Sequence, residues 1–304
     1  MSWAAFLDLP PALPRQADVL LLPLPYEGTV SYGRGTARGP EAIWRASAEV
    51  ELWDEQAEFD LAALRFHTAA AVAAEEDETP ADYLSRVERA AAALHGHGGL
   101  VVGVGGEHAL TPPLVQAAAG GTDDLSGVTV VQLDAHFDLR DTYLGSPHSH
   151  ACAIRRLVER SARVLAVGVR SAAREEADFA RQTDRVLSFP ARQLGDPALE
   201  HELLTALRGL SGDVYLTIDI DVLEVGLCPG TGTPQPGGLS WWQTTRYLQA
   251  LLVENPKCRL IGLDLVETVP QPQTQVNEFT AALLLTKAIS FHAAATARGR
   301  RPES

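Results

Sequence analysis

Six side chains that can bind metal ions fall into three short clusters, and each cluster directly follows an apolar run. The clusters are His108 after residues 99–104, the group Asp134, His136 and Asp138 after residues 128–133, and the pair Asp219 and Asp221 after residues 214–218. Alternate residues of an extended segment point to the same side, so the members of one cluster can converge. Two glycines before His108 allow the tight turn that would present its imidazole.

Four carboxylates held close together repel one another unless positive charge lies between them. Divalent metal ions supply that charge, and an oxygen-rich set with few imidazoles suits manganese better than zinc or copper. Six protein ligands are more than a single metal ion can bind if it is also to keep an open coordination position. We therefore expect two ions, about 3.5–4 Å apart, which share carboxylates and make hydroxide from a bridging water at neutral pH.

Each cluster alone has a less specific interpretation. His108 could be a helix cap or a hydrogen-bonded core residue, and Asp219 and Asp221 could cap the next segment or hold Mg²⁺. The cluster at 134–138 is harder to explain in this way, because burying two acids and an imidazole beside so apolar a strand is costly without a partner. The three clusters together favour the metal site.

The elements that must position these clusters alternate between strands and helices. Apolar runs predict strands at 18–24, 66–72, 99–104, 128–134, 163–169, 185–189, 214–219 and 259–266. Helices are predicted at 39–49, 81–95, 110–119, 153–160, 172–182, 197–207, 240–252 and 278–294, with Pro40 in a first turn and Ser240 as an N-cap. This alternation predicts an α/β domain around a mainly parallel sheet, with the ligand site beyond the carboxyl ends of the strands.

The composition is that of an ordinary globular protein with an excess of acid. The 304 residues are 46% hydrophobic and 21% charged, and the formal net charge is −14. We expect a single domain over residues 1–304, with 1–17 and 298–304 loosely ordered. The acidic balance argues against binding to nucleic acid, whose affinity comes from lysine and arginine on phosphates, and it is compatible with a small cationic substrate.

Cysteine usage and hydropathy bear on the compartment. The three cysteines (Cys152, Cys228 and Cys258) are too few for a disulfide scaffold and indicate a reducing environment. No apolar run approaches the ~20 residues that span a bilayer. The start of the chain lacks the basic and apolar stretches of a secretory signal. We therefore predict a cytoplasmic protein with no membrane partner.

The three clusters resemble the metal-binding signatures of the ureohydrolases, the arginase–agmatinase superfamily. The matching segments are Gly-Gly-Glu-His at 105–108, Asp-Ala-His-Phe-Asp at 134–138 and Ile-Asp-Ile-Asp-Val-Leu at 218–223. Segments 25–27, 31–33, 39–43, 229–234 and 237–240 are also similar to agmatinases, so the resemblance runs from about residue 18 to about residue 289. It implies a three-layer α/β/α sandwich with an eight-stranded parallel sheet, and cleavage of guanidinium compounds to urea at a binuclear manganese centre.

The resemblance also implies a role for each matching residue. It assigns one manganese ion to His108, Asp134, Asp138 and Asp219, and the other to His136, Asp134, Asp219 and Asp221, with Asp134 and Asp219 bridging. It aligns His150 with the histidine that shuttles protons and protonates the leaving amine. It aligns Glu267 with the carboxylate that receives the guanidinium. His148 lies two residues from His150 and competes for its role, and Glu267 alone could be a surface acid.

Elementary chemistry agrees with these roles. A guanidinium carbon is a poor electrophile, so its attack needs a strong nucleophile such as metal-bound hydroxide. The amine must be protonated to leave, and a histidine with a pKa near the operating pH is the natural acid. A carboxylate such as Glu267 can pair with a planar guanidinium in a bidentate way.

The substrate prediction rests on the segment after the aspartate-rich cluster. Arginases bind the amino-acid end of their substrate with Asn-Thr-Pro there, whereas this chain has Leu-Arg-Asp-Thr-Tyr at 139–143, similar to agmatinases. We predict hydrolysis of agmatine to putrescine and urea. Guanidinobutyrate, guanidinopropionate, guanidine and arginine remain alternatives, as do a catalytically weak regulatory homologue and a one-metal amidohydrolase or deacetylase. A substrate carboxylate would need an arginine, for which Arg140 and Arg170 are candidates.

Two departures from the family pattern bear on substrate choice. Glu224 and Val225 stand where Asp-Pro usually follows the third signature, and Ala151 and Cys152 stand where Gly-Thr usually follows the shuttle histidine. We interpret Cys152 as a small buried apolar residue, because no base is assigned to it. The resemblance further implies a homo-oligomer, a trimer or a hexamer.

Overall fold

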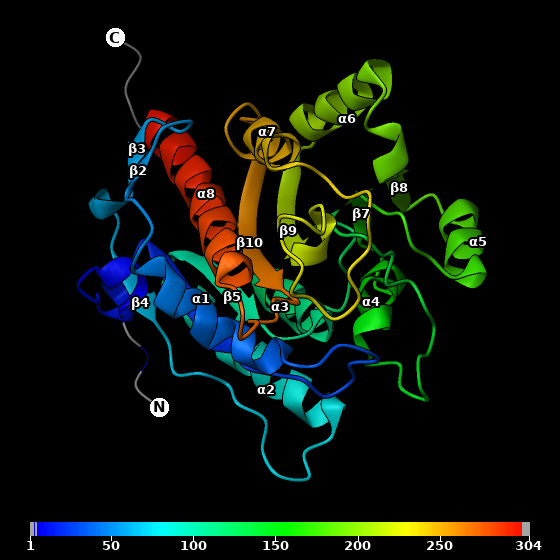
Figure 1. The fold of residues 1–304 in the computed structure, drawn as a ribbon, viewed down its shortest axis with the longest axis horizontal. Helices are drawn as coiled ribbons and strands as arrows, with labels where there is room; N and C mark the ends of the chain where they lie inside the picture. The colour runs from blue at the N-terminus through cyan, green and yellow to red at the C-terminus, as the bar shows by residue number, and fades with distance from the viewer. Residues whose placement is uncertain (1–2, 4, 300–304) are drawn as a thin grey trace.

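The fold is built on one eight-stranded sheet (Figure 1). The computed structural model describes residues 3 and 5–299. The strands of this sheet are β1 (Val19–Leu24), β4 (Phe66–Thr68), β5 (Leu100–Gly105), β6 (Val128–Leu133), β7 (Arg163–Val167), β8 (Val186–Phe189), β9 (Gly212–Asp219) and β10 (Cys258–Val266). They lie in the order β4-β1-β5-β10-β9-β6-β7-β8, and every neighbouring pair is parallel.

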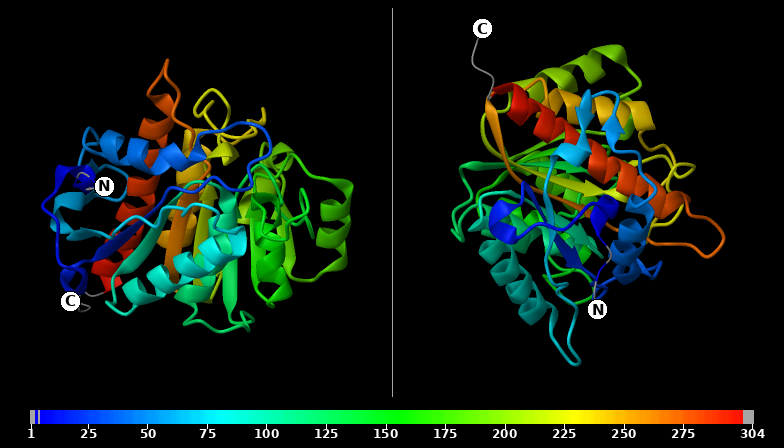
Figure 2. Two further views of the ribbon diagram at one scale, coloured as in Figure 1. Left: turned by 90° about the horizontal axis from the view of Figure 1, so that it is seen from below. Right: turned by 90° about the vertical axis from the view of Figure 1, so that its left-hand side faces the viewer.

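Helices cover both faces of the sheet and complete three layers (Figure 2). One face carries α1 (Gly39–Ser47), α6 (Pro197–Gly209), α7 (Trp241–Leu252) and α8 (Val276–Gly299). The other carries α2 (Pro80–His95), α3 (Thr111–Ala118), α4 (Ala153–Glu159) and α5 (Arg174–Gln182). In β1, Leu21 packs into the first apolar layer, and its neighbours Leu20 and Leu22 pack into the second. This burial on both faces explains why the strands are continuously apolar in sequence.

The three-layer sandwich and its parallel sheet confirm the predicted fold class. All eight predicted strands and all eight predicted helices are present, with their ends shifted by a few residues. The largest strand shift is in β4, which ends at Thr68, and α8 continues to Gly299. Pro40 lies in the first turn of α1, and Ser240 Oγ caps α7 by accepting from the Gln243 N–H at 3.3 Å.

A short hairpin, formed by β2 (Trp53–Asp54) and β3 (Phe59–Asp60), was absent from the prediction. Two-residue strands are too short to show the apolar alternation by which strands are recognised. Lys287 of α8 anchors the hairpin, because its Nζ lies 3.1 Å from Asp54 Oδ1 and both side chains are buried.

Of the segment over residues 1–17 that we expected to be loosely ordered, the structure describes residue 3 and residues 5–17, and some of these side chains are buried. Phe6 and Leu7 are buried, and the Phe6 ring packs edge-on against Trp44 with centroids 5.4 Å apart. This apolar burial holds the segment against α1. At the other end, Arg298 and Gly299 close α8, and the rest of the expected loose segment, residues 300–304, lies outside the described residues.

Within the described residues, α8 is long and apolar enough to cross a membrane by length and composition alone. From the sequence we expected no apolar run of this length. The structure gives α8 another role, since 61% of its most apolar window is buried inside the protein and the helix packs against α1 and α7. A core helix passes the same test as a membrane span, so this feature is weak evidence for a membrane.

The middle of the sheet brings together the segments predicted to carry chemistry. β5, β10, β9 and β6 are neighbours and end at the same edge, because all four are parallel. His108 follows β5, Glu267 follows β10 and Asp219 ends β9. The cluster at 134–138 follows β6.

Candidate metal centre and active site

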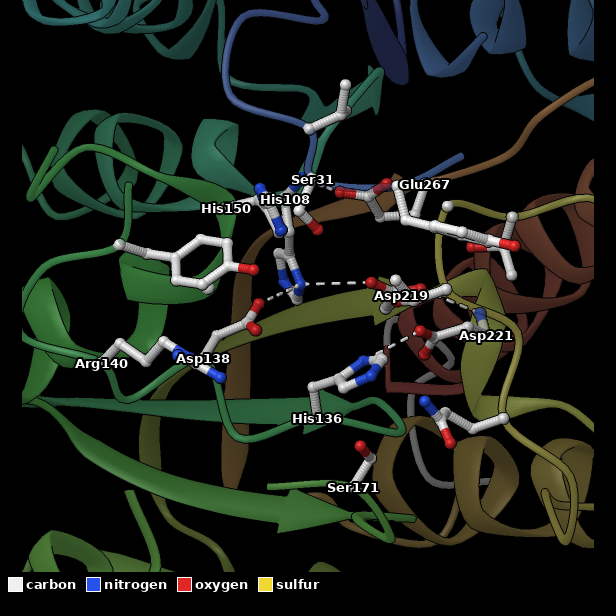
Figure 3. A pocket seen from close by; sticks show the side chains of 18 of the residues that line it. Ser31, His108, His136, Asp138, Arg140, His150, Ser171, Asp219, Asp221 and Glu267 are labelled. Atoms are coloured by element: carbon white, nitrogen blue, oxygen red, sulfur yellow. Dashed lines mark hydrogen bonds and ion pairs between the residues drawn. The ribbon is translucent and has the colours of Figure 1, made fainter. Parts of the chain in front are cut away.

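His108 lies at the centre of one group of carboxylates (Figure 3). Its Nδ1 is 3.1 Å from Asp134 Oδ2, 3.0 Å from Asp138 Oδ2 and 3.4 Å from Asp219 Oδ2. The four side chains are buried. His108, Asp134 and Asp138 form a group whose ligand atoms are close enough to hold one metal ion.

His136 lies at the centre of the second group. Its Nδ1 is 3.0 Å from Asp221 Oδ2 and 3.6 Å from Asp134 Oδ1. Asp134, His136 and Asp221 form another group that could hold an ion, and Asp134 belongs to both groups. The structure thus brings the six expected ligands together, with Asp134 where a bridging carboxylate would stand.

The imidazole of His108 is prepared to bind a cation through Nδ1. Thr217 Oγ1 donates to Asp264 Oδ1 at 2.6 Å, so it accepts from His108 Nε2, which is 2.9 Å away. With the proton on Nε2, Nδ1 is the nitrogen left to bind a cation. Burial alone would lower the pKa of His108, but its contacts with Asp134, Asp138 and Asp219 raise it well above the usual value, so without metal Nδ1 also carries a proton and the ring is positive. Among the described residues, this Nδ1 is one of few buried polar atoms without an aligned hydrogen-bond partner. An orphaned, fully buried nitrogen facing carboxylates fits a metal ligand.

Burial or neighbouring charges raise the pKa values of three of the ligands, Asp138, Asp219 and His136. Burial raises the pKa of Asp138 to about 7, and the charge of Asp134 adds to this effect. Burial and the charge of Asp221 raise the pKa of Asp219. Burial alone would lower the pKa of His136, but its contacts with Asp134 and Asp221 raise it to about 12. These groups therefore hold protons that a divalent cation displaces when it binds.

Glu267 is buried beside the first group of ligands. Its Oε1 accepts from the His108 backbone N–H at 2.7 Å, and its own N–H donates to the Gly106 carbonyl at 2.7 Å. Burial, followed by the charge of Glu107, raises its pKa well above the usual value, and an entering guanidinium would offset this penalty. Asp138 and Glu267 have φ of 53° and 65°, in the left-handed region that non-glycine residues seldom adopt.

His150 lies on the wall of the same cavity, whereas His148 is not among the residues that line it. Burial, with the positive charge of His108, lowers the pKa of His150 to about 4. We had expected a value near the operating pH, so the imidazole is neutral at pH 7. The Tyr143 ring meets it edge-on, with centroids 5.9 Å apart.

The cavity holds about 290 Å³ and opens beside the metal ligands. Loops from all over the chain form its wall, and they include Ser31–Gly33, Arg140, Tyr143, Ser171–Ala173 and Thr231–Thr233. Arg140 lies over the Tyr143 ring at 4.5 Å, and its Nε is 3.8 Å from Glu176 Oε2. Arg170 lies outside this lining and donates to backbone carbonyls, including that of Asp221 at 2.6 Å. Of the two candidate arginines, only Arg140 therefore borders the cavity.

Several residues that support the site were missed by sequence reasoning. Thr217 and Asp264 lie inside strands, and Thr29 lies in a loop, so neither periodicity nor a motif marks them. Glu107 stands inside the Gly-Gly-Glu-His segment and could have been noticed there. It is fully buried, and burial raises its pKa to about 7 against the opposing hydrogen bonds from Thr29.

The two departures from the family pattern have visible structural consequences. Cys152 is buried with Sγ 3.7 Å from the Ser146 carbonyl, and burial raises the pKa of its thiol to about 11, in agreement with a small apolar residue. Glu224 closes the loop that follows β9, because its Oε2 accepts from the Gly237 N–H at 2.9 Å. Its own N–H donates to the Leu239 carbonyl at 2.9 Å.

The chain is similar to known proteins over most of its length. The model of the Arginase family matches residues 17–291. The chain is 36% identical over 281 residues to the N(1)-aminopropylagmatine ureohydrolase of Synechocystis sp., across 90% of this chain and 89% of that protein. It is 34% identical over 296 residues to the agmatinase of Pyrococcus horikoshii, across 94% and 96%. Proclavaminate amidino hydrolase from Streptomyces clavuligerus shares the fold, with a TM-score of 0.83 and 23% identity, across 97% and 98% of the two chains.

Proposed function

The chain belongs to the arginase family and is a ureohydrolase, and from this premise we propose that it hydrolyses agmatine to putrescine and urea with two Mn²⁺ ions. The observation that carries the proposal is the convergence of four carboxylates and two imidazoles at the edge of one cavity. This donor set, rich in oxygen with a minority of imidazole, suits manganese. When bound, the two ions would supply a nucleophile at neutral pH by lowering the pKa of the water they share.

The protein's own residues then bind and orient the substrate. Glu267 is a buried carboxylate of the cavity wall that can pair with a guanidinium, and its Oε1 is held in place by the His108 N–H. Fixing the planar guanidinium in this way aims its carbon at the ligand cluster. Correct orientation of this kind removes much of the entropic part of the barrier.

His150 moves the proton in this proposal. Because its low pKa leaves the imidazole neutral, it first accepts the proton that the attacking water releases. It then gives that proton to the departing amine, which also takes the second proton of the attacking oxygen as urea forms, so the reaction leaves His150 as it began. The agmatine C–N bond breaks, and urea and putrescine are the products.

N(1)-aminopropylagmatine is the second candidate substrate. The relative from Synechocystis sp. is named for it, and that protein is slightly more similar to this chain than the named agmatinase. Both compounds are linear guanidines with a second cationic end, and they differ in the length beyond the reacting group. Tyr32 lines the cavity and is 82% exposed, so a longer tail has room beside it to reach solvent.

Carboxylate-bearing guanidines are less favoured by the cavity wall. Arg140 is the cation that would bind a carboxylate, but it stacks on Tyr143 and lies near Glu176. Its charge is therefore already offset before any substrate enters. Guanidinobutyrate, guanidinopropionate and arginine would have to compete with these contacts.

Urea release from a panel of substrates tests the proposal. The panel contains agmatine, N(1)-aminopropylagmatine, arginine, guanidinobutyrate, guanidinopropionate and guanidine, each assayed with manganese added. We expect the highest kcat/KM for agmatine. A preference for N(1)-aminopropylagmatine would replace the substrate and keep the cationic class, whereas turnover of guanidinobutyrate alone would contradict that class. No urea from any compound would contradict the reaction.

The assembly and the compartment also belong to this proposal. We propose a cytoplasmic homo-oligomer, a trimer or a hexamer, with no nucleic-acid or membrane partner. The three cysteines are free in the structure, which supports a reducing compartment. Light scattering coupled to size exclusion would measure the number of subunits, and a monomer at micromolar concentration would contradict the oligomer.

A further inference from the structure

We propose that Thr29, anchored on Glu107, holds His150 in the tautomer that carries its proton on Nδ1 and keeps Nε2 for the substrate. The inference rests on the proposed function only in giving His150 its proton-transfer role. Thr29 is a positioning residue here, because it would act through the imidazole and not on the substrate.

Glu107 fixes Thr29 at two points. Thr29 Oγ1 donates to Glu107 Oε1 at 2.6 Å, and the Thr29 backbone N–H donates to Glu107 Oε2 at 2.7 Å. Glu107 itself is fully buried directly before His108, at the end of β5. The loop that carries Thr29 is thereby attached to the same strand end as the metal ligands.

Thr29 in turn holds His150 at two points. Its Oγ1 accepts from the His150 backbone N–H at 3.0 Å and lies 3.3 Å from His150 Nδ1. Because the hydroxyl proton of Thr29 points to Glu107, the oxygen presents a lone pair toward the ring. Nδ1 must then be the nitrogen that carries the proton.

The remaining contacts of the ring are consistent with this tautomer. Nε2 is separated from Nδ1 by Cε1, and the His150 side chain lines the cavity, so Nε2 is the nitrogen left to exchange protons. Tyr143 packs edge-on against the ring and restrains its plane. Among the described residues, Ser149 competes with Thr29 for Nδ1. The distance from Ser149 Oγ to His150 Nδ1 is longer, at 3.4 Å.

The tautomer can be read directly, without substrate. Full-length protein labelled with ¹⁵N-histidine, freed of paramagnetic manganese with EDTA, gives different ¹⁵N shifts for protonated and unprotonated ring nitrogens. The chain has nine histidines, and His150→Gln identifies the signal of interest. We expect the proton of wild-type His150 on Nδ1, and a proton on Nε2 would overturn the proposal.

Substitutions at Thr29 test what selects the tautomer. Thr29→Val removes the hydroxyl at nearly constant volume, and we expect a mixed or Nε2-protonated ring and a fall in kcat of about 10²-fold at nearly unchanged KM. Thr29→Ser restores the hydroxyl and should restore both readouts. If Thr29→Val does not fold, Thr29→Ala removes the same group.

A matched control separates Thr29 from its competitor. Ser149→Ala removes the other hydroxyl near Nδ1, and we expect it to leave the tautomer and kcat as in wild type. The proposal is wrong if the Thr29 variants keep the Nδ1 proton and full kcat, or if Ser149→Ala alone changes the tautomer. Wild-type protein that releases no urea from any guanidine would refute the proposed function, while the tautomer result would stand.

Discussion

At the scale of single residues, the site combines ligands with polar partners that fix them. Thr217 lies between His108 and Asp264, and the buried Asp264 carboxylate also accepts from Tyr215 OH at 2.9 Å and Thr111 Oγ1 at 3.0 Å. Such outer partners orient a ligand nitrogen and raise its affinity for metal. Substituting a metal ligand and substituting a residue that hydrogen-bonds to a ligand should therefore change metal binding to different degrees, and single substitutions can measure both.

Asp138→Asn should abolish tight manganese binding and urea release. The amide cannot supply the charge of the carboxylate 3.0 Å from His108 Nδ1. Metal content after gel filtration and urea production measure the two losses. Asp123→Asn is the control, because the Asp123 side chain is 91% exposed and belongs to neither group of possible metal ligands. Full metal content in Asp138→Asn would contradict the ligand assignment.

Thr217→Val should weaken manganese binding by about 10–100-fold. Without the hydroxyl, His108 Nε2 loses the acceptor Thr217 Oγ1, which lies 2.9 Å away, and nothing then favours one tautomer of the imidazole over the other. Titration of metal-free protein by calorimetry measures the dissociation constant. Thr217→Ser retains the hydroxyl and should bind like wild type. Equal affinity in the valine variant would show that this contact does not prepare His108.

His150→Ala should keep the metal and lose about 10²-fold or more in kcat. The side chain lines the cavity but belongs to neither group of possible metal ligands. Metal analysis and steady-state kinetics on one preparation separate binding from turnover. His148→Ala, two residues away, should turn over normally. Normal kcat in His150→Ala would refute the proton-transfer role.

At the scale of elements, the sequence predicts the site where a residue's place follows from a strand end. The ligands after β5, β6 and β9 could be predicted together because the ends of parallel strands meet at one edge. Thr29 could not, since it reaches the site from a loop with no periodic pattern. Asp264 could not either, because a polar residue inside a predicted strand gives no indication of its cross-strand partners.

The same reasoning explains the elements that were wrong or missing. Among the described residues of the segment at 1–17, the buried apolar side chains are Phe6, Leu7 and Ala17, and so short a pattern does not predict docking on α1. The hairpin of β2 and β3 depends on the ion pair between Lys287 and Asp54, which are more than two hundred residues apart. Long-range contacts of this kind leave no local pattern in the sequence.

Lys287→Met tests the connection between α8 and the hairpin. The substitution leaves the Asp54 carboxylate buried without its cation, so we expect the free energy of unfolding to fall by about 3 kcal/mol. Urea unfolding followed by circular dichroism measures the change. Lys257→Met, a lysine outside this ion pair, is the control. A change below about 0.5 kcal/mol would show that the pair does not stabilise the hairpin.

At the scale of the whole molecule, acidity and metal binding are connected. The chain carries a net charge of −14, and burial places several of its carboxylates around one point. A cation that binds there binds only the folded protein, so it adds to the stability of the whole molecule by mass action. That the chain folds as one domain over residues 1–304 stays a prediction, and a single cooperative transition that moves with metal concentration would support it.

The stabilisation by manganese should increase with pH. Without metal, Asp138 has a pKa of about 7 and His136 of about 12, so both hold protons at pH 6, whereas at pH 8 only His136 does. Manganese must displace these protons, and the extra proton at pH 6 weakens its apparent affinity by up to about tenfold per pH unit below 7. The manganese-induced rise in melting temperature should therefore be larger at pH 8 than at pH 6. Differential scanning fluorimetry with and without EDTA measures this rise in melting temperature. The Asp138→Asn variant should lose the rise at both pH values. An equal rise at pH 6 and pH 8 in the wild-type protein would contradict displacement of the Asp138 proton.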